Sequence, residues 1–294
     1  MDSADLLVLG SSGRVGRLLR AVLAGSPRLR AGFASSGGGR ILWQARSGSP
    51  GGDVLKWQPG CPLPRGLSAR VVLALWGVTS GGPEALAQNA VLARAALQLA
   101  QRVGARRVLH LSSAAVQAGL EGAPAAEDMP PAPVTPYGRS KQEMEAAIEQ
   151  WHSVRHGATP RSVVLRVGNL AGADQLFGAI ARGGPVVLDR FPDGAGPRRS
   201  YIGPEDMLRL LARLASCPSA QLPAFVNATG PQPVAMADLV RAAGAELRWR
   251  HAPPGALPVM ALDPTRMQDL CGTLRDSGSA RTLVAQWHRA REAA

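Results

Sequence analysis

Residues 6–16 of the chain read LLVLGSSGRVG. The first four are apolar and predict a short buried strand. The residues around and after the glycines carry apolar side chains at helical spacing, at Val15, Leu18, Leu19, Val22 and Leu23. A strand, a glycine-rich turn and a helix in this order predict the first unit of a parallel α/β fold.

The glycines of this turn, Gly10, Gly13 and Gly16, follow the spacing GxxGxxG. The first permits a tight turn, the second lets the backbone approach a pyrophosphate, and the third allows close packing of helix on strand. Free N–H groups and the positive dipole at the helix start favour phosphates. The spacing predicts a dinucleotide-binding loop; the alternative is a glycine-rich turn without a ligand. We expect cofactor contacts from Gly10, Ser12, Gly13, Arg14, Val15 and Gly16.

Further apolar runs alternate with helical patterns along the first half of the chain. Strands are expected at residues 41–45, 53–57, 71–76, 107–111 and 162–167, and helices at 84–103 and 137–151. Because these strands are apolar throughout, both faces of the sheet must be covered, as in parallel βαβ units. The pattern predicts an α/β fold, with a doubly wound parallel Rossmann sheet and a smaller C-terminal substrate-binding lobe.

The pattern becomes less regular after Val167, where the second lobe is expected to begin. We expect residues 1–168 to form the dinucleotide-binding Rossmann domain, with residues 200–230 returning to it. Residues 169–199 and 231–294 are expected to form the substrate-binding lobe.

Composition limits the classes of partner. The chain has 294 residues and a formal net charge of +12, but its basic residues are scattered arginines, so we expect no nucleic-acid partner. No apolar run reaches the ~18 residues of a membrane helix, and acids occupy the N-terminus where a signal peptide has basic residues. We expect a cytoplasmic protein without a membrane contact. Widely spaced cysteines predict reduced thiols and no metal site: Cys61, Cys217 and Cys271.

The end of the second expected strand reads Gln44-Ala45-Arg46-Ser47. NAD-binding proteins carry an acid at such a position for the ribose 2′-hydroxyl, whereas an Arg beside a hydroxyl suits a 2′-phosphate. We therefore expect NADP(H) to be favoured over NAD(H) through Arg46; a surface arginine is the alternative. Leu75 and Trp76 end a later strand, and we expect both to contact the cofactor.

The segment Tyr137-Gly138-Arg139-Ser140-Lys141 places a phenol and an ammonium four residues apart, on one face of the expected helix. A nearby ammonium favours the phenolate and lowers the phenol pKa, as a general acid/base requires. Ser112 and Ser113 end the strand before it, where a hydroxyl can hold a reacting oxygen. The chain has two lysines and two tyrosines in all, which favours a functional role over a chance pair on an amphipathic helix.

Together these residues resemble the extended short-chain dehydrogenase/reductase family, in its NAD-dependent epimerase/dehydratase branch. The resemblance implies that Ser113 rather than Ser112 acts with Tyr137 and Lys141, and that Lys141 also binds the cofactor ribose. It implies that Asn169, in the segment RVGN, faces the substrate, and that Arg199, in the segment RSYI, binds a substrate phosphate. It also implies a homodimer through the helices at residues 84–103 and 137–151.

The chain departs from the family pattern at positions that bear on the substrate. Sugar dehydratases carry acids after the catalytic hydroxyl, whereas this chain has Ala114 and Ala115, which argues against dehydration. Gln117 replaces a common aromatic residue, and Arg250 is a doubtful match to a second phosphate-binding arginine.

These observations predict an NAD(P)-dependent oxidoreductase or epimerase that acts on a hydroxyl or carbonyl carbon of a small-molecule substrate, with a nucleotide sugar as first choice. Two alternatives stay open: an NADPH-dependent reductase of a non-nucleotide carbonyl compound, and a non-catalytic NADP(H)-binding protein. The intact Ser113, Tyr137 and Lys141 argue against the last.

Overall fold

The computed structural model describes residues 3–34, 39–47, 52–120, 123–154 and 159–293. Its centre is a sheet in which seven described strands pair in the order β11-β6-β5-β4-β1-β2-β3. All of these pairings are parallel. The strands are β1 (Ser3–Leu9), β2 (Ile41–Ala45), β3 (Val54–Lys56), β4 (Ser68–Ala74), β5 (Arg107–Ser113), β6 (Arg161–Val167) and β11 (Phe225–Ala228).

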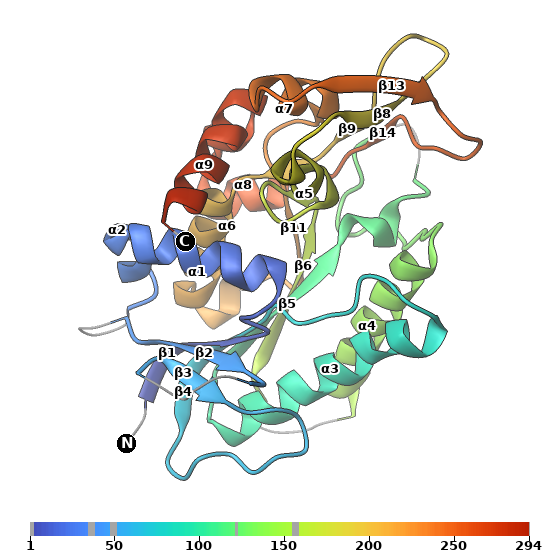
Figure 1. The fold of residues 1–294 in the computed structure, drawn as a ribbon. Helices are drawn as coiled ribbons and strands as arrows, with labels where there is room; N and C mark the ends of the chain where they lie inside the picture. Colours follow the sequence, from blue (N-terminus) through green and yellow to red (C-terminus); the bar gives the residue numbers. More distant parts are fainter. Residues whose placement is uncertain (1–2, 35–38, 48–51, 121–122, 155–158, 294) are drawn as a thin grey trace.

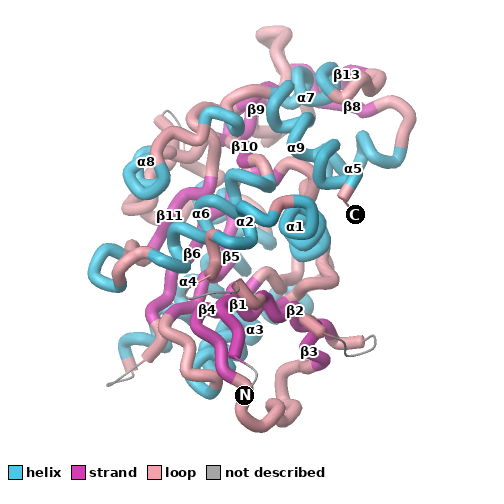
Figure 2. Tube along the Cα trace, turned by 90° about the vertical axis from the view of Figure 1, so that its left-hand side faces the viewer, coloured by secondary structure: helices cyan, strands magenta, loops and turns pink. Residues whose placement is uncertain are grey.

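Both faces of the sheet are covered by helices, which confirms the predicted doubly wound fold (Figure 1). On one face pack α1 (Arg14–Gly25), α2 (Pro27–Ala31), α6 (Pro204–Ser216) and α8 (Thr265–Cys271). Figure 2 looks onto this layer, where α1, α2 and α6 lie side by side. The other face carries α3 (Pro83–Arg102) and α4 (Pro136–Ser153). Because helices cover both faces of the sheet, successive residues of one strand, such as Leu6 and Leu7, point to opposite faces and are both buried.

Strand order reverses at β1, which pairs with β4 on one side and with β2 on the other. The connections that follow β1 and β4 therefore lead to opposite sides of this point. A crevice forms between them at the carboxyl ends of the two strands, and the N-terminus of α1 faces it. This is where the predicted glycine loop lies. Among the helices that the structure describes, none combines the length and apolar character needed to cross a membrane.

Shorter elements build a second layer beyond the carboxyl ends of the strands, at the top of Figure 1. They are β7 (Asn169–Leu170), α5 (Gln175–Arg182), β8 (Val186–Arg190), β9 (Arg198–Arg199), β10 (Tyr201–Ile202), β12 (Val234–Ala235), α7 (Met236–Ala242), β13 (Leu247–His251), β14 (Val259–Met260) and α9 (Ala280–Glu292). Single-turn 3₁₀ helices lie at Ala114–Gln117, Ser219–Gln221 and Arg275–Ser277.

A separate apolar cluster around Phe177, Leu239 and Leu283 holds these elements together. Helix α9 contributes to this cluster through Leu283 and to the main core through Ala290. Because one helix packs on both clusters, the lobe boundaries that the sequence suggested stay a prediction.

Element ends differ from the sequence-based expectation where a strand carries polar residues. Strand β1 begins at Ser3, which pairs with Ser68, and β5 continues to Ser113, which pairs with Val167. Helix α2 was not expected. An apolar run marks the buried middle of a strand, whereas backbone pairing continues through polar side chains at its ends.

Candidate active site

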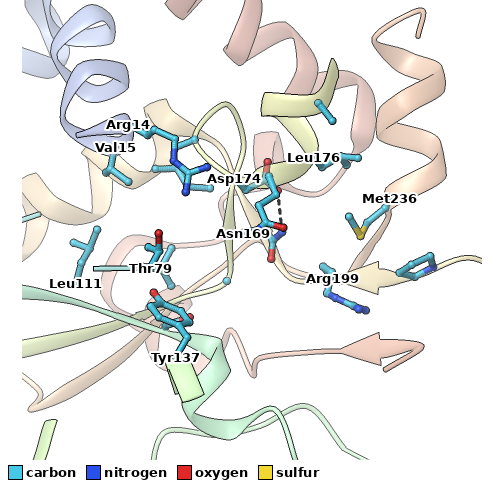
Figure 3. A pocket seen from close by; sticks show the side chains of 18 of the residues that line it. Arg14, Val15, Thr79, Leu111, Tyr137, Asn169, Asp174, Leu176, Arg199 and Met236 are labelled. Carbon is cyan, nitrogen blue, oxygen red and sulfur yellow. Dashed lines mark hydrogen bonds between the residues drawn. The ribbon is translucent and has the colours of Figure 1, made fainter. Parts of the chain in front are cut away.

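A cleft of about 780 Å³ opens at the carboxyl ends of the central strands and extends beneath the second layer (Figure 3). Nine of the residues predicted from the sequence line it: Arg14, Val15, Leu75, Trp76, Ser113, Tyr137, Lys141, Asn169 and Arg199. Five predicted cofactor residues are not part of this lining: Gly10, Ser12, Gly13, Gly16 and Arg46. The cleft therefore brings the predicted catalytic and substrate residues together, with the glycine loop next to it.

The glycine loop has the geometry that its spacing predicts. Gly10 has a φ of 83°, and a Cβ there would lie 2.6 Å from the backbone nitrogen of Trp76. A Cβ on Gly16 would lie 2.6 Å from the carbonyl oxygen of Gly10. Gly13 is the N-cap of α1 without a side-chain cap, and the first turn contains no acid. The N–H groups at this helix start thus remain free for an anion, so the loop fits a dinucleotide pyrophosphate.

Gln44 holds this loop in place, a role that sequence reasoning missed. Its Oε1 accepts a hydrogen bond of 2.9 Å from the Gly10 N–H, and its carbonyl accepts one of 2.7 Å from the Ser11 hydroxyl. Its Nε2 donates to the carbonyl of Trp57. A buried glutamine inside an apolar strand was the available signal. Arg46, just beyond the end of β2, is exposed, and its contact with a 2′-phosphate stays a prediction.

The two serines at the end of β5 face different environments. Ser112 is 5% exposed and its hydroxyl donates to Glu145, which also pairs with Arg166. Ser113 is half-buried, lines the cleft and shares a side-chain hydrogen bond with Tyr137. Both serines line the cleft, but the Ser112 hydroxyl is already engaged by Glu145. This geometry favours Ser113, as the resemblance implied.

Tyr137 lies in the first turn of α4, which is capped by the Thr135 hydroxyl accepting from the Gly138 N–H at 3.0 Å. Burial raises the pKa of Tyr137, while the hydrogen bond from Ser113 and the positive charge of Arg14 lower it. The expected lowering by Lys141 is not among these causes. The phenol is therefore held protonated in the protein alone, in contact with Ser113.

Lys141 is buried below the cleft, one turn after Tyr137. Its Nζ donates to the carbonyl oxygen of Leu111 at 2.9 Å. Burial lowers the pKa of Lys141 to about 8, and the charge of Glu145 acts against this change. Asn89 connects α4 to the segment after β4. Its Nδ2 donates to Ser140 at 3.0 Å, and its Oδ1 accepts from the Val78 N–H at 2.9 Å. The resemblance did not assign it a role.

The predicted substrate residues lie on the far side of the cleft. Asn169 begins β7, and its side chain bonds to Asp174 and Tyr201, two residues that sequence reasoning missed. Arg199 lies on β9 and donates three N–H groups to the carbonyls of Arg198, Leu257 and Pro258. A guanidinium has five N–H groups, so two remain for a ligand.

Charge along the cleft is predominantly positive. Arg14, Lys141, Arg182, Arg199 and Arg250 line it, against two acids, Asp174 and Asp189. Asp189 already pairs with Arg250 at 2.7 Å. Within the described ranges, no group of three or more His, Cys, Asp or Glu side chains is placed to share a metal ion. The lining suits an anionic organic ligand.

The sequence matches the model of the NAD dependent epimerase/dehydratase family over residues 68–219. This range contains Ser113, Tyr137, Lys141, Asn169 and Arg199, whereas the glycine loop precedes it. A curated relative, UDP-glucose 4-epimerase of Azospirillum brasilense, is 42% identical over 73 residues, which are 25% of this chain and 20% of that protein.

Solved structures share the fold over their whole length. MoeE5 in complex with UDP-glucuronic acid and NAD has a TM-score of 0.73 at 21% identity, covering 99% of this chain and 100% of that one. TunA, an NAD dependent NDP-hexosamine 5,6-dehydratase of tunicamycin biosynthesis, has a TM-score of 0.74 at 21% identity, covering 100% and 99%. A UDP-galactose 4-epimerase has a TM-score of 0.70 at 19% identity, covering 98% and 99%.

The family match extends from β4 to the helix α6 and the 3₁₀ turn after it, and it includes the three cleft residues with acid/base chemistry. It covers more than half of the 294 residues. The fold of the rest is shared with the solved structures. The chain therefore belongs to the NAD-dependent epimerase/dehydratase family.

Proposed function

We propose that this protein is an NAD(P)-dependent oxidoreductase or epimerase acting on a hydroxyl or carbonyl carbon of a nucleotide sugar. The observation that carries the proposal is the meeting of Ser113, Tyr137 and Lys141 in one cleft beside the uncapped start of α1. The positive lining of the cleft supports an anionic substrate. The family match and the nucleotide-sugar relatives support the substrate class.

Each member of the trio has a role that follows from its contacts. Tyr137 exchanges a proton between its phenol oxygen and the substrate oxygen, and Ser113 hydrogen-bonds that same oxygen. Lys141, whose Nζ donates to the Leu111 carbonyl in the protein alone, would hold the cofactor ribose. When bound, the nicotinamide cofactor supplies the hydride chemistry. The glycine loop and Arg14 would hold its phosphates, and Val15, Leu75 and Trp76, which line the cleft, would contact the rest of it.

Tyr137→Phe tests the acid/base role. The variant keeps the ring and removes the proton, so we expect turnover of an identified substrate to fall by roughly 10²–10⁴-fold, with cofactor affinity retained. Val259→Ala, at an exposed position of β14 outside the cleft lining, is the control. Unchanged turnover in Tyr137→Phe would contradict the proposed mechanism.

The cofactor proposal is NADP(H) in preference to NAD(H), supported by Arg46 and Ser47 after the end of β2. Two of the solved structures named above, MoeE5 and TunA, are described with NAD, which makes this the sharpest point to test. Fluorescence titrations of NADPH and NADH with wild type, Arg46→Ala and the exposed control Arg248→Ala decide it. Tight NADPH binding that weakens only in Arg46→Ala supports the proposal. Equal or tighter NADH binding that ignores Arg46 overturns it and favours an epimerase.

One observation favours a second candidate, an NADPH-dependent reductase of a non-nucleotide carbonyl compound. Arg199, the expected phosphate ligand, already donates three N–H groups to backbone carbonyls. Binding of UDP and dTDP by calorimetry separates the two candidates. Specific binding that weakens in Arg199→Ala supports the nucleotide sugar, and no binding of either nucleotide favours the second candidate.

We further propose a homodimer in which α3 and α4 pack against the same helices of a second copy. Val91, in the middle of α3, is 49% exposed, and the two helices lie against one another on the outer face of the sheet. The cytoplasmic location expected from the sequence stays a prediction.

A further inference from the structure

Asn169 is fixed in the cleft by both its backbone and its side chain. Its N–H donates to the carbonyl of Ser200 at 2.7 Å, and β7 pairs with β10 at Tyr201. Its Nδ2 lies 2.8 Å from Asp174 Oδ2 and 3.3 Å from the hydroxyl oxygen of Tyr201. Figure 3 shows the bond to Asp174 on the cleft side of α5. The side-chain amide can take two orientations, with Oδ1 and Nδ2 exchanged, and its neighbours determine which one it adopts.

Asp174 acts as an acceptor on both oxygens. Oδ1 accepts from the Phe177 N–H at 2.9 Å, which caps helix α5. Oδ2 accepts from the Tyr201 hydroxyl at 2.8 Å. A phenol has one proton, and that of Tyr201 is directed to Asp174, so its oxygen is free to accept from Asn169. The Asp174 carboxylate and the Tyr201 oxygen therefore both accept a hydrogen bond from the Asn169 side chain, which must present its N–H groups to them.

The reversed amide is excluded by the same contacts. Asn169 Oδ1 in place of Nδ2 would lie 2.8 Å from a carboxylate oxygen without a proton between them. Burial raises the pKa of Asp174 above its usual value, and the bonds from Phe177, Asn169 and Tyr201 and the charge of Arg14 oppose this rise. Amide orientation follows from such a network. Nδ2 therefore points to Asp174, and Oδ1 points away from it.

We propose that Asn169 offers a hydrogen-bond acceptor to the cleft, and that the site selects a substrate hydroxyl or N–H at this point. Asp174 and Tyr201 are positioning residues that fix this polarity. Asn169 lines the cleft, and its Oδ1 receives no hydrogen bond from any residue that the structure describes. The inference rests on the proposed function, because it concerns the sugar part of the proposed substrate.

The orientation of the Asn169 amide also limits where the diphosphate of the proposed substrate can bind. An amide oxygen repels a phosphate oxygen, so the diphosphate cannot lie at Asn169. It must instead lie near cations of the cleft that the cofactor does not use, such as Arg182 and Arg199, which has two N–H groups left. Asn169 then contacts a neutral part of the substrate that carries a donor.

The orientation can be measured without any substrate. The chain contains three asparagines, Asn89, Asn169 and Asn227, so selective ¹⁵N-asparagine labelling gives three side-chain amide pairs in an NMR spectrum. Asn169→Ala assigns the relevant pair. We expect one Asn169 amide proton to be shifted downfield and protected from exchange, and to move in Tyr201→Phe. A pair at the position of a free amide, unchanged in Tyr201→Phe, overturns the inference.

Asp174→Asn should reverse the polarity of the site. Asparagine is as good an N-cap as aspartate, so its Oδ1 keeps the Phe177 N–H and its Nδ2 turns to Asn169. Asn169 then presents Oδ1 to residue 174 and Nδ2 to the cleft. Asp238→Asn, the same substitution at an exposed position of α7 outside the cleft lining, is the matched control.

Binding to the NADP⁺-loaded protein tests the specificity, with UDP-glucose and its 2-, 3-, 4- and 6-deoxy analogues as probes. We expect one deoxy position to weaken binding roughly tenfold in wild type and in Asp238→Asn, since a lost hydrogen bond leaves an acceptor unpaired. That difference should fall below about twofold in Asp174→Asn, a change too small to assign to a hydrogen bond. Equal affinities for all analogues overturn the inference while leaving the proposed function intact. If no UDP-sugar binds, the proposed substrate is wrong, and the NMR spectrum alone decides the orientation of Asn169.

Discussion

Glu145 of α4 and Arg166 of β6 form a buried ion pair, with Oε2 and Nη2 2.9 Å apart. Each side chain is about 95% buried, and each has further partners. Glu145 accepts from Ser112, and Arg166 donates to the carbonyl of Glu127 at 3.1 Å. The pair thus joins the end of β5, the helix of Tyr137 and Lys141, and the strand that leads to Asn169. The elements of the candidate site are held together by charges that no solvent reaches.

Removing one partner of this pair should strongly destabilise the protein. Glu145→Ala leaves the Arg166 charge buried and unpaired, and we expect the free energy of unfolding to fall by roughly 3–5 kcal/mol. Urea unfolding followed by circular dichroism measures this. Glu246→Ala removes an exposed pair with Arg248 and should cost less than about 1 kcal/mol. Equal small effects in both variants would contradict a structural role for the buried pair.

The two adjacent serines should separate activity from stability. Ser113→Ala removes the hydroxyl that bonds to Tyr137, and we expect kcat to fall by about 10²-fold with the free energy of unfolding almost unchanged. Ser112→Ala removes one of the two hydrogen bonds to Glu145 Oε1, which keeps the one from Arg166 Nε at 3.2 Å, and should cost about 1.5–3 kcal/mol while kcat remains measurable. Thermal unfolding and turnover are measured for both. A larger loss of kcat in Ser112→Ala would reverse the assignment.

The ammonium of Lys141 should titrate well below the range of an exposed lysine. Burial lowers its pKa to about 8. With two lysines in the chain, ¹³C-lysine labelling gives two sets of side-chain signals, and Lys56→Arg assigns them. We expect the Lys141 signal of the cofactor-free protein to shift with a midpoint near pH 8. A midpoint above pH 10 would contradict this prediction, because it would show that burial does not disfavour the ammonium form of Lys141.

The lowered pKa of Lys141 also makes the stability of the protein depend on pH. The folded pKa is about 8 and the unfolded value is 10.5, so between these pH values the unfolded chain binds more protons. The contribution of Lys141 to the free energy of unfolding therefore becomes more favourable as pH rises through this window. Wild type should gain stability relative to Lys141→Met from pH 8 to 10, and a constant difference would contradict the shift.

The proposed dimer predicts a position-dependent effect of charge. Val91→Arg places a cation in the middle of α3 and should convert the protein to a monomer at micromolar concentration, because the same residue of both copies lies near the interface of a two-fold dimer. Val259→Arg, at a position 51% exposed in β14, is the control. Sedimentation velocity measures both. A monomeric wild type would exclude this interface.

Much of the site was predictable from local sequence patterns. Gly10, Gly13 and Gly16 act through turn geometry and helix packing, and both depend on neighbours in the chain. Tyr137 and Lys141 lie on one helical face because of their spacing alone. Where a residue contacts partners distant in sequence, prediction failed. Asp174 and Tyr201 carried no local signal that paired them with Asn169, and a glutamine inside an apolar strand did not reveal that the partner of Gln44 is the glycine loop.

Sequence by itself determined the α/β fold, the glycine loop and the presence of a phenol and an ammonium one turn apart. These follow from periodicity and spacing, which are properties of neighbouring residues. Only the tertiary structure decided which way Asn169 turns its amide and how many N–H groups Arg199 has left. Both depend on partners from other segments, Asp174 and Tyr201 in one case and the carbonyls of Leu257 and Pro258 in the other. Hydrogen bonds are satisfied between atoms that the fold brings together, and no pattern along the chain records these pairings.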